Sequence, residues 1–348
     1  TDIGPVIDAE AQRNLLRHIE RMKPLASDFY QLDLPPECEH GTFVAPTMIE
    51  IASLSELQRE VFGPVLHVIR YRREQLPQLI DAINATGYGL TLGIHSRIDE
   101  TIDFITSRAH VGNIYVNRNI VGAVVGVQPF GGERKSGTGP KAGGPLYLKR
   151  LQRNPAVTCG KPVIVPPVRP AFDHLLAWAH LHGHARVVAL AQAYAHASLL
   201  NTVQVLPGPT GERNTLSFAP RGTVLCAASD EDALLNQLAA VLASGNRILV
   251  SAESMALLPT ALPQAVRDAI APLASNDIAH ADVQIALVDT ACAAEWLPLL
   301  AARDGALVPL LETTATDLIP LWRLAAERAV CVNTAAAGGN ANLMTLGM

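Results

Sequence analysis

The sequence is poor in charge, in cysteine and in long apolar runs, and each shortage excludes a class of protein. Charged residues make up 17% of the 348 residues, whereas about 25% is usual for a globular domain. We therefore expect extensive buried interface, a missing partner chain, or both. The net charge of −5 excludes a generic basic surface for nucleic acid, so no nucleic-acid partner is predicted.

The cysteines are few and scattered, without a Cys-x-x-Cys pair, and they are Cys38, Cys159, Cys226, Cys292 and Cys331. This pattern argues against a disulfide framework and predicts a reduced, cytoplasmic compartment. No stretch of about 20 apolar residues could span a bilayer, so no transmembrane segment is predicted. The sequence starts at Thr1 with neither an initiator methionine nor a signal-peptide pattern. We therefore expect the chain to begin inside a longer protein.

The length predicts two domains, at about 150 residues for each. The charges of residues 1–160 cancel, so the whole net charge of −5 lies in residues 161–348. Four prolines break regular structure between positions 161 and 170. We predict an incomplete first domain at residues 1–160 and a second domain at residues 161–330. Residues 331–348 form a Gly/Ala-rich tail without charge, which we expect to dock into a protein groove.

Predicted strands alternate with predicted helices in the first domain, which is typical of an α/β fold with a parallel sheet. Asp8 can cap a helix that ends near Lys23, with apolar Leu15, Ile19 and Met22 on one face. Further helices are predicted at residues 74–86 and 99–109, the second capped by Asp99. Strands are predicted at residues 41–51, 64–71, 90–95 and 111–116.

The second domain repeats this alternation in a Rossmann-like pattern, so both halves of the chain predict the α/β class. Helices are predicted at residues 170–180, 185–196, 230–244, 263–273 and 293–303. Strands are predicted at residues 223–227, 247–250, 283–288, 306–310 and 329–333.

The segment Glu60-Val61-Phe62-Gly63-Pro64 precedes a predicted strand and is the first candidate for a binding site. The Glu60 carboxylate could accept hydrogen bonds from a ribose diol, and the Phe62 ring could pack on a nicotinamide face. The alternative is that Glu60 only caps or solvates a loop and that Gly63-Pro64 is an ordinary turn.

A glycine-rich stretch follows the strand at residues 111–116 and is the second candidate. Long loops without secondary structure are usually functional or disordered. A flexible linker is the alternative, although linkers rarely carry so many interspersed Val and Phe residues. The N–H groups of Gly122 and Ala123 could receive a carboxylate, because glycine allows close approach. Phe130 could form the wall for an aliphatic chain, or could simply be a core aromatic.

These motifs resemble the aldehyde dehydrogenase superfamily, and within it the branch that oxidises L-glutamate γ-semialdehyde (Δ1-pyrroline-5-carboxylate). Similar motifs occur in the C-terminal part of the bifunctional proline utilization A enzymes. The resemblance covers about residues 1–155. It rests on TDIGPVID, GTFVAPTMIE, EVFGPVL, GYGLTLGIHSR, GNIYVNRNIVGAVVGVQPFGG and SGTGPKAGGPLY.

The resemblance implies an NAD-dependent oxidation in which a cysteine thiolate attacks the aldehyde, hydride passes to NAD, and water then releases glutamate. By motif, Glu60 would bind the nicotinamide ribose and Phe62 would contact the nicotinamide side. Gly122 and Ala123 would anchor the α-carboxylate of the substrate through main-chain N–H groups. Phe130 would pack on the aliphatic part of the substrate.

The departure from the family pattern is that its nucleophilic cysteine, general-base glutamate and NAD-binding units all precede TDIGPVID. The resemblance therefore implies no catalytic residue in this chain, and we predict that the chain alone is inactive. Cys226 and Cys331 lie in apolar strand-like runs and are expected to be inert. The implied partners are glutamate γ-semialdehyde, the rest of the enzyme polypeptide and further copies of it in a homo-oligomer. FAD would belong to a proline dehydrogenase domain outside this sequence, and peripheral membrane association of the full-length enzyme stays open.

Residues 206–254 resemble a second, altered copy of the first Rossmann units of an aldehyde dehydrogenase. Ser229-Asp230-Glu231-Asp232 stands where the family has a Trp-Asn-Phe-Pro stretch, and Ser251 stands where a lysine is expected. We interpret the domain as noncatalytic, acting as a lid over the substrate-channelling path or as an oligomerisation module. An ordinary nucleotide-binding α/β domain is the alternative.

Four histidines, at positions 174, 180, 182 and 184, invite a metal site. Gly183 interrupts the helical register, so not all four rings can converge. Imidazoles near a helix C-terminus also interact favourably with the helix dipole. We favour this second interpretation and predict no metal.

Overall fold

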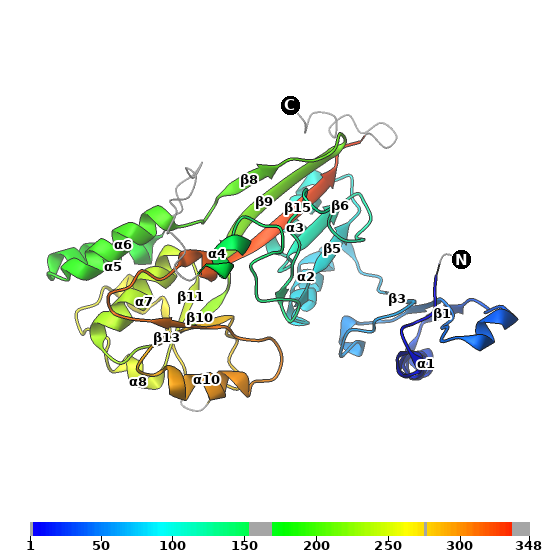
Figure 1. Cartoon of the computed structure of the whole chain (residues 1–348), viewed down its shortest axis with the longest axis horizontal. Coiled ribbons are helices and arrows are strands. Elements are labelled where there is room, and N and C mark those ends of the chain that lie inside the picture. Colours follow the sequence, from blue (N-terminus) through cyan, green and yellow to red (C-terminus); the bar gives the residue numbers. More distant parts are fainter. Residues whose placement is uncertain (1–2, 153–168, 275–276, 336–348) are drawn as a thin grey trace. The chain divides into compact units, whose positions relative to one another are not determined.

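The computed structural model describes residues 3–152, 169–274 and 277–335 (Figure 1). The chain divides into two compact units, Thr1–Thr86 and Gly87–Met348. Both combine helices with parallel strand pairs, so the predicted α/β class is confirmed. The predicted boundary near residue 160 lies outside the described residues and stays a prediction.

The first unit packs a helix on a three-stranded sheet. Helix α1 (Ala9–Met22) begins where the Asp8 side chain accepts a hydrogen bond from the Ala11 N–H at 2.8 Å, as predicted. Its buried face contains Leu15, Ile19 and Met22. The sheet consists of β1 (Asp28–Gln31), β2 (Thr47–Glu50) and β3 (Val65–Val68), and β2 pairs with β1 antiparallel and with β3 parallel. Helix α2 (Leu76–Ala85) completes the unit.

The second unit contains a mixed sheet in the order β5-β6-β15-β9-β8. Strand β15 (Ala325–Asn333) runs parallel to β6 (Asn113–Val116) and antiparallel to β9 (Glu212–Pro220). Figure 1 shows the red C-terminal strand lying between the cyan and green strands. Two segments assigned by sequence to different domains therefore share one sheet. The remaining elements are β4 (Tyr88–Gly89), β5 (Thr91–Ile94), α3 (Asp99–Arg108), β7 (Glu133–Arg134), α4 (Tyr147–Leu151) and β8 (Val203–Leu206).

A five-stranded parallel sheet in the order β12-β11-β10-β13-β14 forms the rest of the second unit. The order in which strands are added to the sheet reverses between the first strand (β10) and the fourth (β13), which is the Rossmann arrangement predicted from sequence. The strands are β10 (Thr223–Ala227), β11 (Arg247–Val250), β12 (Ile270–Pro272), β13 (Ile285–Asp289) and β14 (Leu310–Thr313). The helices are α5 (Pro170–Leu181), α6 (Ala185–Ala197), α7 (Glu231–Ala243), α8 (Ala252–Met255), α9 (Gln264–Arg267) and α10 (Ala293–Ala301).

Several predicted elements were wrong in extent or type. The helix predicted at residues 263–273 ends after one turn, because Ile270–Pro272 pairs with β11 and becomes a strand. The strand predicted at residues 306–310 begins only at Leu310, since Pro309 has no N–H to donate to the ladder. Asp99 is the first residue of α3, and Ile98 is its N-cap.

Strand β1 was not predicted, and only Phe29 of its four residues is even half-buried. The strand predicted at residues 41–51 covers only Thr47–Glu50. Short 3-10 segments lie at Lys23–Leu25, Pro36–His40, Leu54–Glu56, Arg73–Gln75 and Leu321–Leu324. Within the described ranges, no helix combines the length and apolarity that crossing a membrane requires.

Candidate functional site

The loop with Glu60 and Phe62 lies between Leu54–Glu56 and β3 in the first unit. Both side chains are exposed, and Phe62 is 88% exposed. Gly63 holds this loop against α1, because a Cβ atom there would lie 2.5 Å from Leu15 Cδ1. The loop thus presents an exposed carboxylate and an exposed aromatic ring close to α1.

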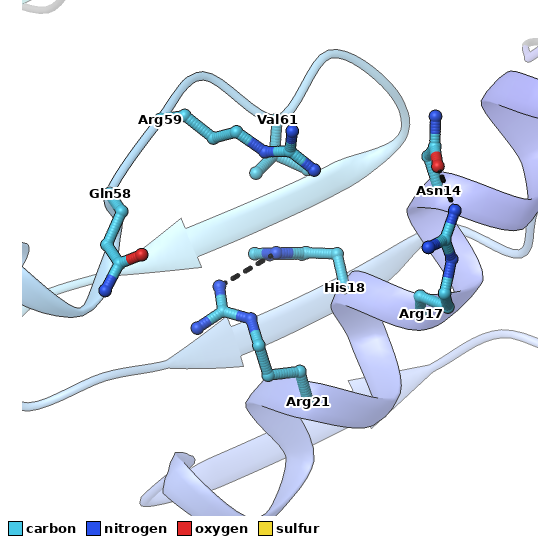
Figure 2. Close-up of a pocket in the computed structure, with 7 residues that line it drawn as sticks. All are labelled: Asn14, Arg17, His18, Arg21, Gln58, Arg59 and Val61. Carbon is cyan, nitrogen blue, oxygen red and sulfur yellow. Dashed lines mark hydrogen bonds between the residues drawn. The ribbon is translucent and has the colours of Figure 1, made fainter.

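A cavity of about 370 Å³ lies next to this loop, between it and α1 (Figure 2). Its lining residues on α1 follow a helical spacing of three and four, which places them on one face. They are Asn14, Arg17, His18 and Arg21, and the loop adds Gln58, Arg59 and Val61. The sequence prediction missed this cavity, although the helical spacing of Arg17 and Arg21 is a signal that could have indicated a basic face. We call it the arginine cavity.

The second predicted group lies in the other unit, within residues 118–144, which we call the glycine loop. The Gly122 N–H donates to the Ile120 carbonyl at 2.8 Å, so this donor already has an acceptor. In the described part of the chain, by contrast, no acceptor pairs with the Ala123 N–H. Val121 and Val125 beside them are exposed. The structure therefore leaves Ala123 as the more available of the two predicted donors.

Phe130 is half-buried, and its main chain is fixed by two hydrogen bonds with Ala142, at 3.0 and 2.9 Å. Next to this bridge, the Lys141 ammonium is buried and donates to Asn113 Oδ1 at 2.8 Å and to the Gly131 carbonyl. Burial lowers the pKa of Lys141 to about 8, and the nearby Glu327 and Glu133 carboxylates oppose that shift. The end of the glycine loop that contains Lys141 is thereby attached to β6 through Asn113.

Side chains of strands β9 and β15 also form polar contacts with the glycine loop. Arg118 forms an ion pair with Glu212 at 2.6 Å, and Gln128 Nε2 donates to Asn214 Oδ1 at 2.9 Å. The buried Glu327 carboxylate accepts the Lys141 main-chain N–H at 2.7 Å. We call these three contacts the loop anchors. They were not predicted, because they join positions that are up to 186 residues apart.

A second ionic contact supports the same arrangement: Arg328 of β15 lies 3.6 Å from the Glu133 carboxylate. Desolvation raises the pKa of Glu327, and the Lys141 N–H and ammonium oppose this shift. A buried carboxylate bonded to Lys141 attaches this end of the glycine loop to the interior of the second unit.

Three of the four cysteines that the structure describes have a pKa raised by their surroundings. Burial raises the pKa of Cys226, which is fully buried in β10. Burial also raises the pKa of Cys331, whose Sγ lies 2.9 Å from Arg118. Burial, followed by Asp289, Glu295 and Glu253, raises the pKa of Cys292. Thiols held protonated are poor nucleophiles. Cys159 lies outside the described residues.

The carboxyl ends of β10 and β13, where Rossmann folds bind dinucleotides, carry acidic side chains that make local hydrogen bonds. Asp289 is 8% exposed and accepts hydrogen bonds from Ser229 Oγ and the Ala291 N–H, both at 2.9 Å. Asp230 caps α7 with its own side chain. A carboxylate at this position repels phosphate, which disfavours a dinucleotide there.

Two of the four histidines near the end of α5 stack on one aromatic ring. Trp178 stacks on His182 and His184, with centroid distances of 5.1 and 4.8 Å. His182 Nδ1 also lies 2.9 Å from the Trp178 carbonyl. In the described ranges, no group of three His, Cys, Asp or Glu side chains has the geometry to hold a metal ion.

Comparison with known proteins identifies the first part of the chain. The model of the aldehyde dehydrogenase family matches residues 1–155. Residues 1–155 are part of an aldehyde dehydrogenase domain. The whole chain is 49% identical over 369 residues to the bifunctional protein PutA of Escherichia coli (strain K12). The aldehyde dehydrogenase segment is also 37% identical over 150 residues to a 1-pyrroline-5-carboxylate dehydrogenase of Geobacillus sp. (strain WCH70), which covers 42% of the chain.

A solved structure extends the likeness beyond the aldehyde dehydrogenase segment. Proline utilization A (PutA) from Corynebacterium freiburgense is 25% identical to this chain, with a TM-score of 0.59. The match covers 89% of this chain and 30% of the solved one. The chain spans 28% of the length of both curated relatives.

Proposed function

We propose that this chain is the C-terminal part of a bifunctional proline-catabolic enzyme, and that it contributes to NAD-dependent oxidation of L-glutamate γ-semialdehyde to glutamate. The observation that carries the proposal is the 49% identity to a bifunctional PutA protein over the entire chain. The rest of that polypeptide would supply the nucleophile and most of the NAD site. Four free cysteines, without a disulfide among the described residues, favour a cytoplasmic enzyme. The homo-oligomer stays a prediction.

The glycine loop fits a short amino-acid aldehyde. The Ala123 N–H is available for the α-carboxylate, and Gly122 could join it by exchanging its bond to Ile120 for the ligand. Phe130, fixed by its bridge to Ala142, would pack on the aliphatic chain. These groups would bind and orient the substrate, and none of them would transfer a proton or attack the aldehyde.

The loop before β3 fits the nicotinamide half of NAD. The exposed Glu60 carboxylate suits the two ribose hydroxyls, and the exposed Phe62 face suits the nicotinamide side. NAD, when bound, would accept the hydride from the reacting carbon. The contribution of this chain would be to hold and orient the ribose.

Replacing Glu60 by Ala in the complete enzyme should raise KM for NAD by about 10- to 100-fold. The reason is the loss of charge-assisted hydrogen bonds worth roughly 1.5–3 kcal/mol. Steady-state kinetics with varied NAD measures the effect, and proline oxidation by the same polypeptide should not change. The matched control is Glu37→Ala, which removes an exposed carboxylate elsewhere in the first unit. Unchanged NAD affinity in Glu60→Ala would contradict the cofactor role.

The second domain predicted from sequence, residues 161–330, which we call the second segment, has a candidate function of its own, as a noncatalytic module that supports the aldehyde dehydrogenase site. The observation that favours it is the set of loop anchors, since Glu212, Asn214 and Glu327 all belong to strands of this segment. The hydrogen-bonded carboxylate of Asp289 at the carboxyl end of β13 argues against nucleotide binding, which is the alternative.

The loop anchors can be tested in the complete enzyme with Glu212→Gln. The ion pair with Arg118 is largely buried, so removing its charge should loosen the glycine loop and raise KM for the semialdehyde about 10-fold. KM for NAD should stay unchanged, which a general loss of folding would not produce. Glu312→Gln removes an exposed carboxylate on β14 and serves as the control. If Glu212→Gln leaves KM for the semialdehyde unchanged, the supporting role is wrong.

A further inference from the structure

The arginine cavity concentrates positive charge that the described residues do not neutralise. Its lining contains three guanidinium groups, Arg17, Arg21 and Arg59, and none of its seven residues is acidic. None of the three arginines forms an ion pair with a carboxylate in the described ranges. Arginine stays charged at any physiological pH. The cavity therefore holds about three positive charges with no internal counterion.

Two of the three arginines are positioned by hydrogen bonds to neutral side chains rather than by ion pairs with carboxylates. Arg17 donates to Asn14 Oδ1, and Arg21 donates to His18 Nδ1 at 3.3 Å. Figure 2 shows Asn14, Arg17, His18 and Arg21 along α1, with Arg59 on the facing loop. Each guanidinium presents five N–H donors, so these bonds leave most of them available for a ligand.

His18 adds no charge to the cavity, and its hydrogen bond links α1 to strand β3. Because Arg21 donates to Nδ1, the proton of the neutral ring is on Nε2, which donates to His67 Nε2 on β3 at 2.9 Å. Burial, then His67, Arg21 and Arg59, lowers the pKa of His18 to about 4. At neutral pH the anion attraction therefore comes from the arginines alone, on a helix that the histidine pair fixes to β3.

We propose that the arginine cavity is a binding site for a diphosphate group. Guanidinium groups bind phosphate oxygens in pairs of parallel hydrogen bonds, and three of them match the charge of a diphosphate. The volume of about 370 Å³ is within the range of small-molecule sites. Asn14 and Gln58 add amide groups that can bind the remaining oxygens.

Two sources could supply this group. Arg59 and Val61 flank Glu60 in the sequence, so the diphosphate of the dinucleotide is one source, and this version depends on the proposed function. A free diphosphate-bearing metabolite is the other source, and it does not depend on that function.

The binding test titrates this chain with inorganic pyrophosphate in an isothermal calorimeter at low and high salt. We expect saturable binding that weakens as salt rises, because the attraction is ionic. Arg21→Gln and Arg59→Gln should each weaken binding about 10-fold or more. Arg13→Gln removes an exposed arginine of α1 that does not line the cavity, and it should bind like the unchanged chain. No binding, or equal binding by all three variants, would overturn the proposal.

The second experiment distinguishes the sources in the complete enzyme. If the dinucleotide is the ligand, NAD should compete with pyrophosphate, and Arg21→Gln and Arg59→Gln should raise KM for NAD about 10-fold. If a free metabolite is the ligand, pyrophosphate should bind equally well at saturating NAD. Pyrophosphate binding that depends on the arginines, together with unchanged NAD affinity in Glu60→Ala, would disprove the cofactor role while supporting the diphosphate site.

Discussion

The isolated 348-residue chain is expected to show no NAD-dependent oxidation of glutamate γ-semialdehyde above an enzyme-free blank. This is a loss of roughly 10³-fold or more against the complete enzyme, since covalent catalysis needs an activated nucleophile. Burial raises the pKa of Cys226, Cys292 and Cys331, so these thiols stay protonated at neutral pH. Formation of NADH, followed by its absorbance, measures the rate.

The positive control is the complete enzyme in the same assay. A second control treats the chain with a thiol-alkylating reagent, which would abolish any activity that depends on one of its own cysteines. Turnover by the chain that exceeds the blank and disappears on alkylation would show that a cysteine within residues 1–348 is the nucleophile. The prediction of inactivity would then be wrong.

Replacing Gly112 by Ala is expected to destabilise the chain by about 3 kcal/mol or more and to detach the glycine loop. A Cβ atom at this position would lie 1.9 Å from the Gly131 carbonyl oxygen and 2.6 Å from Lys141 Nζ. The first clash is with backbone, which cannot rotate away, so β6 and the loop must separate. Separation would also break the contacts between Lys141, Asn113 and Gly131. Urea unfolding, followed by circular dichroism, measures the change in stability.

Gly131→Ala is the matched control, because it adds the same methyl group on the opposite side of the same contact. Its Cβ atom would lie 3.4 Å from Lys141 Cα, which is ordinary van der Waals distance. We expect a change below about 1 kcal/mol for this variant. Equal stability of the two variants would mean that the close approach of β6 to the glycine loop does not determine the packing there.

The elements that could be predicted from sequence are those with a strong local signal. The cap at Asp8 and the apolar spacing of α1 gave its bounds almost correctly, and the apolar runs of β10 and β11 matched their strands residue for residue. Strand β12 could not be predicted, because its three residues become a strand only through pairing with β11. Local propensity favoured a helix there, and tertiary pairing prevailed.

The residues of the candidate site also fall into two groups, those that a local motif identifies and those that only the fold brings together. Glu60, Phe62, Gly122, Ala123 and Phe130 belong to contiguous motifs, so they could be named from sequence, although their roles stay proposals. The loop anchors could not be named, since Glu327 meets Lys141 only after β15 has paired with β6. The arginine cavity needs α1 and a loop about 40 residues later to face each other, which no single motif shows.

The position of β15 between β6 and β9 has a consequence for biosynthesis. During translation, β6 leaves the ribosome more than 200 residues before the strand that covers its open edge. Until then, β6 has unpaired main-chain groups on that side, and exposed strand edges promote association with other chains. Closing such a long segment is also slow, because non-local pairing costs chain entropy before any contact forms. Shortened chains that end before Ala325 would therefore keep an adhesive edge permanently, and their solubility, rather than their catalysis, would be the first property to suffer.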